Sequence, residues 1–434
     1  MKPAPALVAA LVALGLVGAL VVAGLVAATA FWAAAGLLVV LALVDAAQLR
    51  AVRTPEVVRD LPATIPLGIE RVVTLHLRQH GRTPLALDVH DLHPADWPVS
   101  GLPRRVVLPP NAELALPYRT TPVARGVFRY EACELDVHSP LGLWRRKLRA
   151  ASAQTLRVFP NFAPLAQLAL VGAEQASRVI GAHLRRRRGE GTEFHQLREY
   201  RTGDALRQID WKATGRVRKL ISRDYHDERN QQVVVVLDTG RRMAARDGTY
   251  AHFDHVLNAV LMVAYIALRR GDAVGLCAIG GDSRFLPPRR GPATVNRILE
   301  TVFDLVPRPV ATDYLEAATH LGVRQPRRSL VIIVTNVRDD DLDDLLIAVR
   351  QLQRRHLVCV ASLREQALDD AQSQPVRTLD DALTAGALAR YLDERTRAHA
   401  ALRAEGVPVL DVTSAQIPAA LVDYYLSVKR SASL

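Results

Sequence analysis

The chain has 434 residues, 49% of them hydrophobic, and a formal net charge of +12. This length is typical of two or three domains, and the basic balance suits a membrane surface, an acidic partner or nucleic acid. No nucleic-acid-binding motif and no aromatic-interleaved basic groove is found, which favours the membrane interpretation. The cysteines are three, an odd number, and each lies in an apolar, strand-like stretch: Cys133, Cys277 and Cys359. This pattern excludes a disulfide framework and indicates buried thiols in a reducing compartment.

The segment from Pro3 to Val44 carries no charged residue and is long enough for two membrane spans of about 20 residues each. We expect residues 1–50 to form two transmembrane helices with a turn at Thr29–Trp32. Lys2 precedes the first span, and Arg50 and Arg53 follow the second. Because basic residues flank cytoplasmic ends, both outer ends are expected in the cytoplasm.

A signal peptide ending at Ala28-Thr29-Ala30 is the alternative for this segment, because these residues have the A-x-A form. Its amino-terminal region has only Lys2, and its apolar run is longer than such peptides use. If cleavage occurred there, the second span would still leave the remaining chain on the cytoplasmic side. The expected topology is therefore the same for both.

Residues 55–160 show short alternating stretches, in which apolar residues occupy every second position. Turn residues separate them, as at Arg125-Gly126 and at Ser139-Pro140-Leu141-Gly142. These features predict a β-sandwich of immunoglobulin-like type. His90 and His93 are two histidines without a third partner, which do not define a metal site. The alternating residues are Val73, Leu75 and Leu77, then Leu85, Leu87 and Val89, then Leu114, Leu116 and Tyr118.

Residues 163–228 are predicted to be a helical arm followed by a docking segment. A helix from Ala163 to Arg188 ends in four arginines, which either approach lipid headgroups or pair with the acids that follow. In the docking segment, Asp204 is expected to cap a helix from Ala205 to Thr214 that Gly215 ends. A strand is expected over Lys219–Tyr225.

Residues 229–430 alternate between buried strands and helices, which predicts a doubly wound, mostly parallel α/β sheet. Functional loops in such a sheet lie at the carboxyl ends of the strands, where Asp238, Thr312 and Asn336 are expected. The predicted strands are Val233–Leu237, Ala273–Ile279, Ser329–Val334, Leu357–Ser362 and Val407–Val412. The predicted helices are Phe253–Arg270, Val295–Leu305, Asp313–Val323, Leu342–Gln353 and Leu379–Ala404.

The docking segment contains the run EFHQLREYRTGDALRQIDWK, which resembles the signature of the bacterial family called domain of unknown function 58. The matching residues are Glu193, Phe194, Leu197, Arg198, Tyr200, Gly203, Asp204, Arg207, Ile209, Trp211 and Lys212. The resemblance implies a protein tethered to the bacterial inner membrane that has a von Willebrand factor type A-like domain. It also implies, as a partner, an AAA+ ATPase of the MoxR type.

The resemblance further implies a divalent-cation site built from D-x-S-x-S, a distant Thr and a distant Asp. Asp238 matches the first position and Thr312 the distant Thr, but Gly240 and Arg242 replace both serines, and Asn336 replaces the distant Asp. A hard cation needs several oxygen ligands, so the site is expected to be degenerate, with no cofactor beyond weakly held Mg²⁺. We expect the Arg242 guanidinium to substitute for the cation as the counter-charge of Asp238.

Residues 339–344 include an acidic run, Asp339, Asp340, Asp341, Asp343 and Asp344, which is typical of a helix amino terminus. His195 and His226 are expected to be surface or paired residues. No G-x-S-x-G, H-E-x-x-H or P-loop motif is found, so catalysis is not expected.

Three functions therefore stay open. The first is a membrane-anchored interaction scaffold facing the cytoplasm. The second is a basic protein that binds nucleic acid or a membrane surface through residues 185–219. The third is a membrane hydrolase of unrecognised type. The sequence does not give the oligomeric state.

Overall fold

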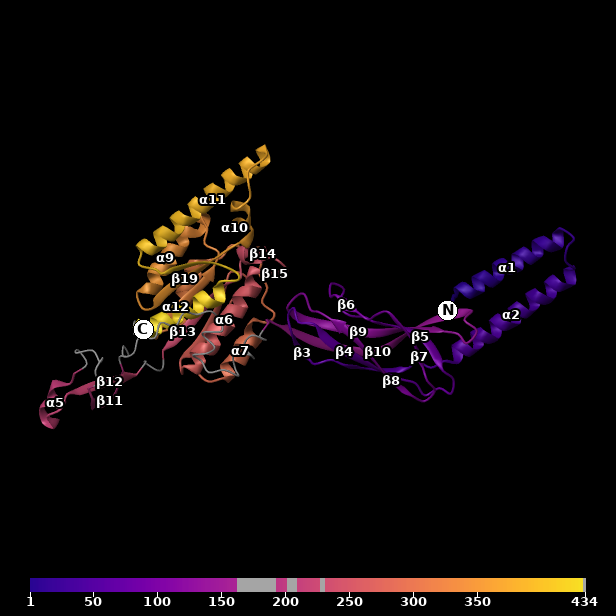
Figure 1. The fold of residues 1–434 in the computed structure, drawn as a ribbon, viewed down its shortest axis with the longest axis horizontal. Coiled ribbons are helices and arrows are strands. Elements are labelled where there is room, and N and C mark those ends of the chain that lie inside the picture. The colour runs from indigo at the N-terminus through magenta and orange to yellow at the C-terminus, as the bar shows by residue number, and fades with distance from the viewer. Residues whose placement is uncertain (162–192, 201–208, 227–230, 432–434) are drawn as a thin grey trace. The chain divides into compact units, whose positions relative to one another are not determined.

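The computed structural model describes residues 1–161, 193–200, 209–226 and 231–431, which form two compact units, Met1–Phe159 and Pro160–Leu434 (Figure 1). The predicted arm from Ala163 to Arg188 lies outside the described residues. Each unit is described separately below.

Two apolar helices begin the first unit, α1 (Pro5–Val22) and α2 (Ala28–Ala51). Both are long and apolar enough to cross a membrane, which indicates a membrane protein. The expected turn at Thr29–Trp32 is wrong, because the chain turns earlier, where Gly24 has a φ of +74° that an L side chain disfavours. Trp32 instead lies exposed within α2.

The predicted sandwich is present as two sheets, in the orders β1-β10-β9-β5-β7, with β3 beside β10, and β2-β4-β8-β6. The alternation seen in the sequence sets the buried face: Val73, Leu75 and Leu77 of β4 are all fully buried. The strands are β1 (Lys2–Pro3), β2 (Glu56–Asp60), β3 (Thr64–Pro66), β4 (Arg71–Arg78), β5 (Leu85–Asp91), β6 (Val99–Ser100), β7 (Arg104–Leu108), β8 (Glu113–Thr120), β9 (Gly126–His138) and β10 (Trp144–Phe159).

Asp45, near the end of α2, joins the helical hairpin to the sandwich. Its buried carboxylate accepts hydrogen bonds from the Ser139 hydroxyl (2.5 Å) and from the backbone N–H groups of Leu141 (2.9 Å) and Leu143 (3.1 Å). Ser139 and Leu141 lie in the predicted turn before β10, and Leu143 directly follows it. The pairing of β1 with β10 places the amino terminus on the same side of the hairpin as the sandwich.

The second unit contains a six-stranded sheet in the order β17-β16-β13-β18-β19-β20, parallel except for the edge strand β17. The uninterrupted apolar strands are buried on both faces, as a parallel sheet requires. The strands are β13 (Gln232–Asp238), β16 (Ala273–Ile279), β17 (Arg284–Arg289), β18 (Leu330–Thr335), β19 (Leu357–Arg364) and β20 (Val409–Thr413). Two short strands, β14 (Arg246–Asp247) and β15 (Tyr250–Ala251), pair with each other.

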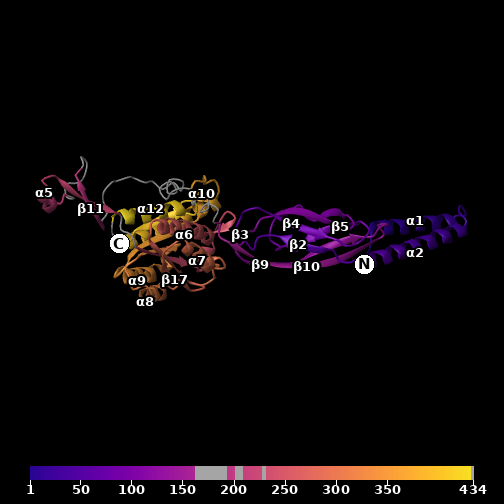
Figure 2. The same ribbon diagram turned by 90° about the horizontal axis from the view of Figure 1, so that it is seen from below.

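Helices cover both faces of this sheet, which confirms the doubly wound prediction (Figure 2). Residues of α6 (His252–Arg269), α7 (Ala293–Val302) and α12 (Ile417–Ser431) join one core cluster. Residues of α8 (Tyr314–Arg324), α9 (Leu342–Gln353) and α11 (Leu379–Ala404) join the other. The short α10 (Gln366–Gln372) precedes α11, and two single-turn 3₁₀ helices lie at Arg241–Ala244 and Asp339–Asp341.

The docking segment forms an antiparallel pair of strands, β11 (Glu193–Glu199) and β12 (Ile221–His226), with the helix α5 (Trp211–Val217) between them. The predicted helix Ala205–Thr214 is wrong in its bounds: among the described residues the helix begins later, at Trp211, and ends later, at Val217. Ile209 lies in an isolated β-bridge with Ser222, and the Asp210 side chain caps α5 by accepting from the Ala213 N–H. Gly215 lies inside α5, and Arg218 adopts the left-handed conformation at its end.

Candidate functional site

The candidate site lies at the topological switch point of the six-stranded sheet, between the neighbouring strands β13 and β18. The chain runs outward from β13 to β16 and β17, and then returns to β18 on the other side of β13. The loops that follow β13 and β18 therefore separate at the carboxyl edge, which is where open α/β sheets bind ligands. Asp238 ends β13 and Thr335 ends β18, so both residues lie at this edge.

The Asp238 carboxylate is 1% exposed and is held by four neutral donors. Its Oδ1 accepts from the Gly240 N–H (2.7 Å) and the Thr312 hydroxyl (2.5 Å). Its Oδ2 accepts from the Thr335 hydroxyl (2.6 Å) and, at 3.3 Å, the Tyr314 hydroxyl. Burial, together with the charge of Asp238, raises the pKa of Tyr314 well above its ordinary value, so the phenol stays protonated and can donate. Asp238 and Thr312 are thus brought together as predicted.

Gly240 replaces the first serine of the D-x-S-x-S pattern, and the packing explains why. A Cβ atom on this residue would lie 2.3 Å from Thr312 Oγ1 and 3.0 Å from Asp238 Oδ1. Gly280, in the loop after β16, is also close: a Cβ atom on it would lie 2.9 Å from the Gly240 nitrogen, and its φ is +99°. The Thr312 hydroxyl therefore occupies the space that a serine side chain would need.

Arg242 lies beside this site, but its ion pairs are with the acidic run and not with Asp238. Its Nη2 contacts a carboxylate oxygen of Asp340 and one of Asp341 (2.7 Å), and its Nη1 lies 3.4 Å from the Asn336 carbonyl oxygen. The expectation that Arg242 pairs directly with Asp238 needs correction. The 3₁₀ turn Arg241–Ala244 directs the guanidinium towards residues 340–341, while neutral groups already fill the positions around Asp238. Asp343 and Asp344 lie in the first turn of α9, as expected.

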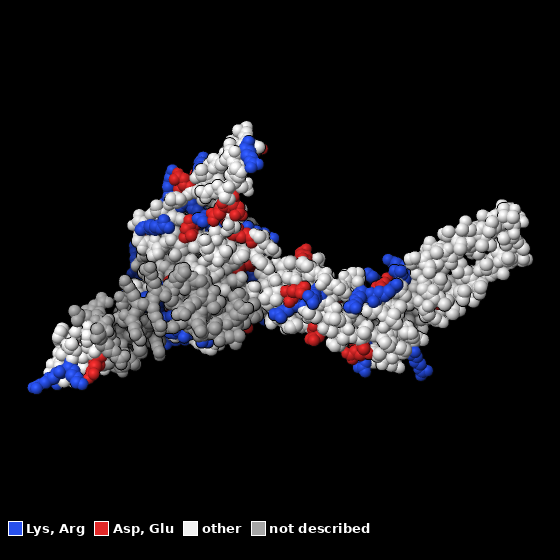
Figure 3. All heavy atoms as spheres, in the orientation of Figure 1, with Lys and Arg blue, Asp and Glu red and all other residues white. Residues whose placement is uncertain are grey.

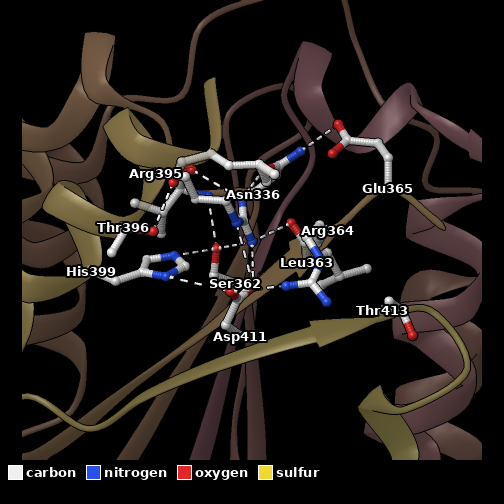
Figure 4. A network of polar contacts seen from close by, with 12 residues as sticks. Asn336, Ser362, Leu363, Arg364, Glu365, Arg395, Thr396, His399, Asp411 and Thr413 are labelled. Carbon is white, nitrogen blue, oxygen red and sulfur yellow. Dashed lines mark hydrogen bonds and ion pairs between the residues drawn. The ribbon is translucent and has the colours of Figure 1, made fainter. Parts of the chain in front are cut away.

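Asn336 stands where the pattern has an aspartate, and its amide group uses both of its functions (Figure 4). Its Oδ1 accepts from Arg395 Nη1 (2.8 Å), and its Nδ2 donates to Glu365 Oε1 (2.9 Å). A carboxylate at this position has no proton to donate to Glu365. The departure from the pattern at residue 336 therefore has a structural cause.

Arg395, a buried residue of α11, connects the ends of three strands (Figure 4). Besides Asn336, its guanidinium donates to Ser362 Oγ (2.7 Å), the Leu363 carbonyl oxygen (2.8 Å) and Asp411 Oδ1 (2.9 Å). The sequence motifs did not point to this residue. A signal was present, because Arg395 lies three and seven residues before the buried Ala398 and Leu402, which places it on the apolar face of the helix.

Ser362, His399 and Asp411 have the composition of a nucleophile, a base and an acid, but not the geometry. His399 Nε2 lies 3.1 Å from Ser362 Oγ, whereas His399 Nδ1 lies 3.7 Å from Asp411 Oδ2, which is too far for a hydrogen bond. Ser362 is fully buried, and its oxygen already accepts from Arg395. Burial, and then the charge of Arg395, lowers the pKa of His399 to about 4. This group of residues stabilises the fold in the arrangement described.

The other predicted residues lie apart from this site in the sequence and in their contacts. Glu193, Phe194, Leu197 and Arg198 belong to β11, and the Tyr200 N–H donates to the Leu220 carbonyl oxygen. Trp211 is 70% exposed and begins α5 with Lys212. Gly203, Asp204 and Arg207 fall outside the described residues, and His195 and His226 belong to β11 and β12.

The histidines of the sandwich and the three cysteines are the remaining candidates for a metal site or a nucleophile. His93 Nδ1 contacts the Pro94 carbonyl oxygen, and no group of three or more metal-ligating residues occurs among the described residues. Cys133, Cys277 and Cys359 are buried free thiols. Burial raises the pKa of Cys133 to about 12, of Cys277 to about 11 and of Cys359 to about 12, which makes them poor nucleophiles.

Residues 196–402 match the family described as Protein of unknown function DUF58. This match confirms, for that part of the chain, the resemblance seen in the signature. The Uncharacterized protein YeaD of Bacillus subtilis (strain 168) is 21% identical over 242 residues, which is 55% of this chain and 58% of that protein. The match thus spans less than two thirds of the relative's length.

Similar solved structures include an aerotolerance-related membrane protein from Bacteroides fragilis NCTC 9343, at 13% identity. That match covers 47% of this chain and 100% of the other, with a TM-score of 0.29. The CARDB domain of PF1109 from Pyrococcus furiosus is 16% identical and has a TM-score of 0.18, over 24% of this chain and 94% of that domain. TM-scores this low do not establish a shared fold.

Proposed function

We propose that the chain is a membrane-anchored interaction scaffold whose α/β domain is of the von Willebrand A-like type and works with an AAA+ ATPase of the MoxR type. The observation that carries the proposal is the buried Asp238 at the switch point, whose two oxygens both accept hydrogen bonds from neutral groups of the protein. Domains of this type bind a cation at this position. In the proposal, the position of Asp238 instead belongs to a rigid surface that binds the partner protein.

The residues present do not fit a divalent cation. Both oxygens of Asp238 already accept hydrogen bonds, and the second expected carboxylate is the Asn336 amide, which Arg395 and Glu365 engage. Arg242 adds a positive charge beside the site, which disfavours a second cation. No step of the proposed function is therefore assigned to a metal.

Isothermal titration of the full chain with Mg²⁺ and with Mn²⁺ tests this part of the proposal. We expect no binding in the micromolar range, and no difference between the wild type and Asp238→Ala. Micromolar binding that Asp238→Ala abolishes would contradict it.

The rim of the site has the composition of a protein-binding face. Val306, Val310 and Leu315 are exposed apolar residues in the loop and the helix start that deliver Thr312. The Arg241–Asp340 ion pair, at 3.3 Å, is half exposed beside them. Apolar anchors with adjacent charged groups are typical of interfaces between proteins.

Recovery of partners from solubilised membranes tests the proposed partner. We expect an AAA+ ATPase to be recovered with the wild type, and lost with Val310→Asp or Leu315→Asp. Val323→Asp is the matched control, because Val323 is exposed at the other end of α8 and should retain the partner. Trp211→Ala and Arg207→Glu test the family signature in the same way.

Two results would contradict the scaffold. One is recovery of nucleic acid in place of an ATPase, with strong salt dependence, which favours the second function considered above. The other is equal loss of the ATPase in Val323→Asp, which would show that the rim of the site has no special part.

The cytoplasmic orientation is part of the same proposal. It is supported by Lys2, Arg50 and Arg53 at the outer ends of the hairpin, and by β1, which places the amino terminus beside the sandwich. Protease added to intact spheroplasts should spare the sandwich and the α/β domain. Digestion of these domains from outside would overturn the orientation.

A further inference from the structure

A pocket of about 490 Å³ lies between the end of α2 and the turn that joins β4 to β5. The wall from the helix side includes Gln48, Ala51 and Arg53, and the wall from the sandwich includes Arg78 and residues 79–83. This volume is within the range of small-molecule sites. The pocket opens where the apolar helix gives way to the polar sandwich, which is the level of lipid headgroups if α2 spans a bilayer.

The pocket is strongly basic. Arg53, Arg78 and Arg82 line it, and no hydrogen bond or ion pair connects the guanidinium group of any of the three to another described residue. His80 is a further lining residue, and neither Asp nor Glu is among the described residues of the lining. Glu56 lies opposite Arg78 in the pairing of β2 with β4, but does not line the pocket. Three guanidinium groups without internal partners are suited to an external phosphate.

Gln79 supplies a hydrogen-bond acceptor to the pocket, in contrast to the arginines, which are donors. Its side chain is 3% exposed, and its Nε2 donates to the carbonyl oxygens of Thr83 (3.2 Å), Leu108 (2.7 Å) and Pro109 (2.5 Å). These three acceptors fix the orientation of the amide, because an oxygen in that place would face three oxygens. Its Oε1 is buried and has no hydrogen-bond partner among the described residues. An unpaired buried acceptor is costly, and a hydroxyl group in the pocket would satisfy it.

The glycine of the turn leaves space at this oxygen. A Cβ atom on Gly81 would lie 3.3 Å from Gln79 Oε1, so a larger residue would crowd the acceptor that faces the pocket-lining turn. Oε1 is itself buried, so a hydroxyl group would reach it past Gly81, where no side chain stands in the way.

The two walls are held together by contacts of the helix with the sandwich. The Asp45 carboxylate binds the turn before β10, and Trp144 Nε1 donates to the Ala42 carbonyl oxygen (2.9 Å). Arg146 donates to the carbonyl oxygens of Leu49 and Arg50 at the end of α2. Figure 3 shows basic atoms near the base of the hairpin and no charged atoms along the rest of the hairpin on the face in view. The pocket is therefore a preformed feature of the membrane-proximal part of the first unit.

We propose that this pocket binds the headgroup of an anionic phospholipid that carries free hydroxyl groups, of the phosphatidylglycerol type. The arginines bind the phosphate, and Gln79 Oε1 accepts a hydrogen bond from a headgroup hydroxyl. The apolar surface of α2 above the pocket accommodates the acyl chains. This site is independent of the carboxyl edge of the α/β sheet and of its proposed partner.

Lipid binding by the full chain in detergent tests the proposal, with native mass spectrometry as the readout. The probes are phosphatidylglycerol, phosphatidylcholine and, as a soluble headgroup, sn-glycerol 3-phosphate. We expect phosphatidylglycerol to be retained in preference to phosphatidylcholine. The affinity for it should fall by roughly fivefold for each arginine that is changed to glutamine in Arg53→Gln, Arg78→Gln and Arg82→Gln.

Arg71→Gln is the matched control, because Arg71 is an exposed arginine at the other end of β4, and it should leave the affinity unchanged. Arg82→Gln changes only an exposed turn residue, so it tests the site even if Arg53→Gln or Arg78→Gln fails to fold. Equal affinities of Arg82→Gln and Arg71→Gln would overturn the proposal. So would full displacement of the lipid by sn-glycerol 3-phosphate at equal concentration, which would identify a site for a soluble phosphate instead.

Discussion

Asp91 in the sandwich and Asp238 in the α/β domain are both buried carboxylates, but they are neutralised in different ways. Asp91 accepts two hydrogen bonds from Arg59, at 2.8 and 2.5 Å, and one from Tyr118 at 2.7 Å. Asp238 accepts only from hydroxyl groups and one backbone N–H. Asp91 thus forms a complete ion pair, whereas no cation among the described residues donates a hydrogen bond to Asp238.

Neutral donors alone do not mark a functional site, because Asp45 also has neutral donors and joins the hairpin to the sandwich. Asp238 differs from both other carboxylates in its place at the switch point of the parallel sheet. A bidentate arginine satisfies Asp91 entirely within the core, so nothing outside the sandwich is needed. Around Asp238 the nearby cation, Arg242, is engaged with Asp340 and Asp341 at the surface. The comparison therefore supports the carboxyl edge as the site and the sandwich as the support.

The largest effect is expected from breaking the ion pair of the sandwich with Arg59→Met. Asp91 would then be buried without a cation, and the free energy of unfolding should fall by about 3–5 kcal/mol. Thermal unfolding of the full chain in detergent measures this change. The double variant Arg59→Met with Asp91→Leu should recover much of the loss. A single-variant cost below about 1 kcal/mol would show that the pair is not what stabilises this core.

Acid should act on the α/β domain through His399. Burial and the charge of Arg395 lower its pKa to about 4 in the fold from 6.5, and Asp411 opposes this shift. The unfolded chain therefore takes up the proton first as the pH falls below 6.5. Stability should decrease by up to about 3 kcal/mol between that pH and about 4. Unfolding of His399→Gln over this range should lack this part of the slope, whereas His320→Gln, at an exposed site, should keep it.

Gly240→Ala tests the close packing around Asp238. Because the new Cβ atom would lie 2.3 Å from Thr312 Oγ1, we expect a loss of about 1–3 kcal/mol in thermal unfolding. Gly322→Ala is the control: a methyl group added to this helical glycine would meet no atom within 4 Å, so alanine should stabilise α8 by up to about 1 kcal/mol. Equal stability of Gly240→Ala and the wild type would mean that the loop moves freely to make room.

The smallest effect is expected from neutralising Asp238 with Asp238→Asn. The amide oxygen can keep the hydrogen bonds from the Gly240 N–H and Thr312, and the Thr335 hydroxyl can rotate to accept from the new amide nitrogen, so we expect a loss of about 1 kcal/mol. The same change at Asp91 leaves Arg59 buried without its counter-charge and should cost several times more. Parallel unfolding of Asp238→Asn and Asp91→Asn makes this comparison. Similar losses would remove the distinction drawn between the two carboxylates.

Much of the α/β fold was predictable because its strands and helices carry strong local patterns. Ala273–Ile279, Leu342–Gln353 and Leu379–Ala404 were predicted with the bounds that the structure shows. The edge strand β17 was missed because Pro287 and Pro288 interrupt it, and only an unpaired edge tolerates these residues. In the sequence, the two prolines indicate a loop, and only the pairing with β16 shows that the segment is a strand.

The candidate site was predictable only in part. Asp238 and Thr312 were expected at one edge, because parallel strands bring their carboxyl ends together, and a hydrogen bond joins them. Arg395 and the partners of Arg242 were not expected, because these contacts depend on how α11 and the turn at residues 339–341 pack on the sheet. Residues 395 and 336 are far apart in the chain, and no local pattern links them.

Local residue patterns were sufficient to define the apolar hairpin, the alternating strands of the sandwich and the α/β order, because each depends on the hydrophobic period of a single segment. Packing between segments set which charges meet. It gave Asp91 a cation, left Asp238 with neutral donors and placed three arginines around the pocket at the end of α2. Such pairings are set by distances between segments remote in the chain, and hydrophobic periodicity carries no information about them.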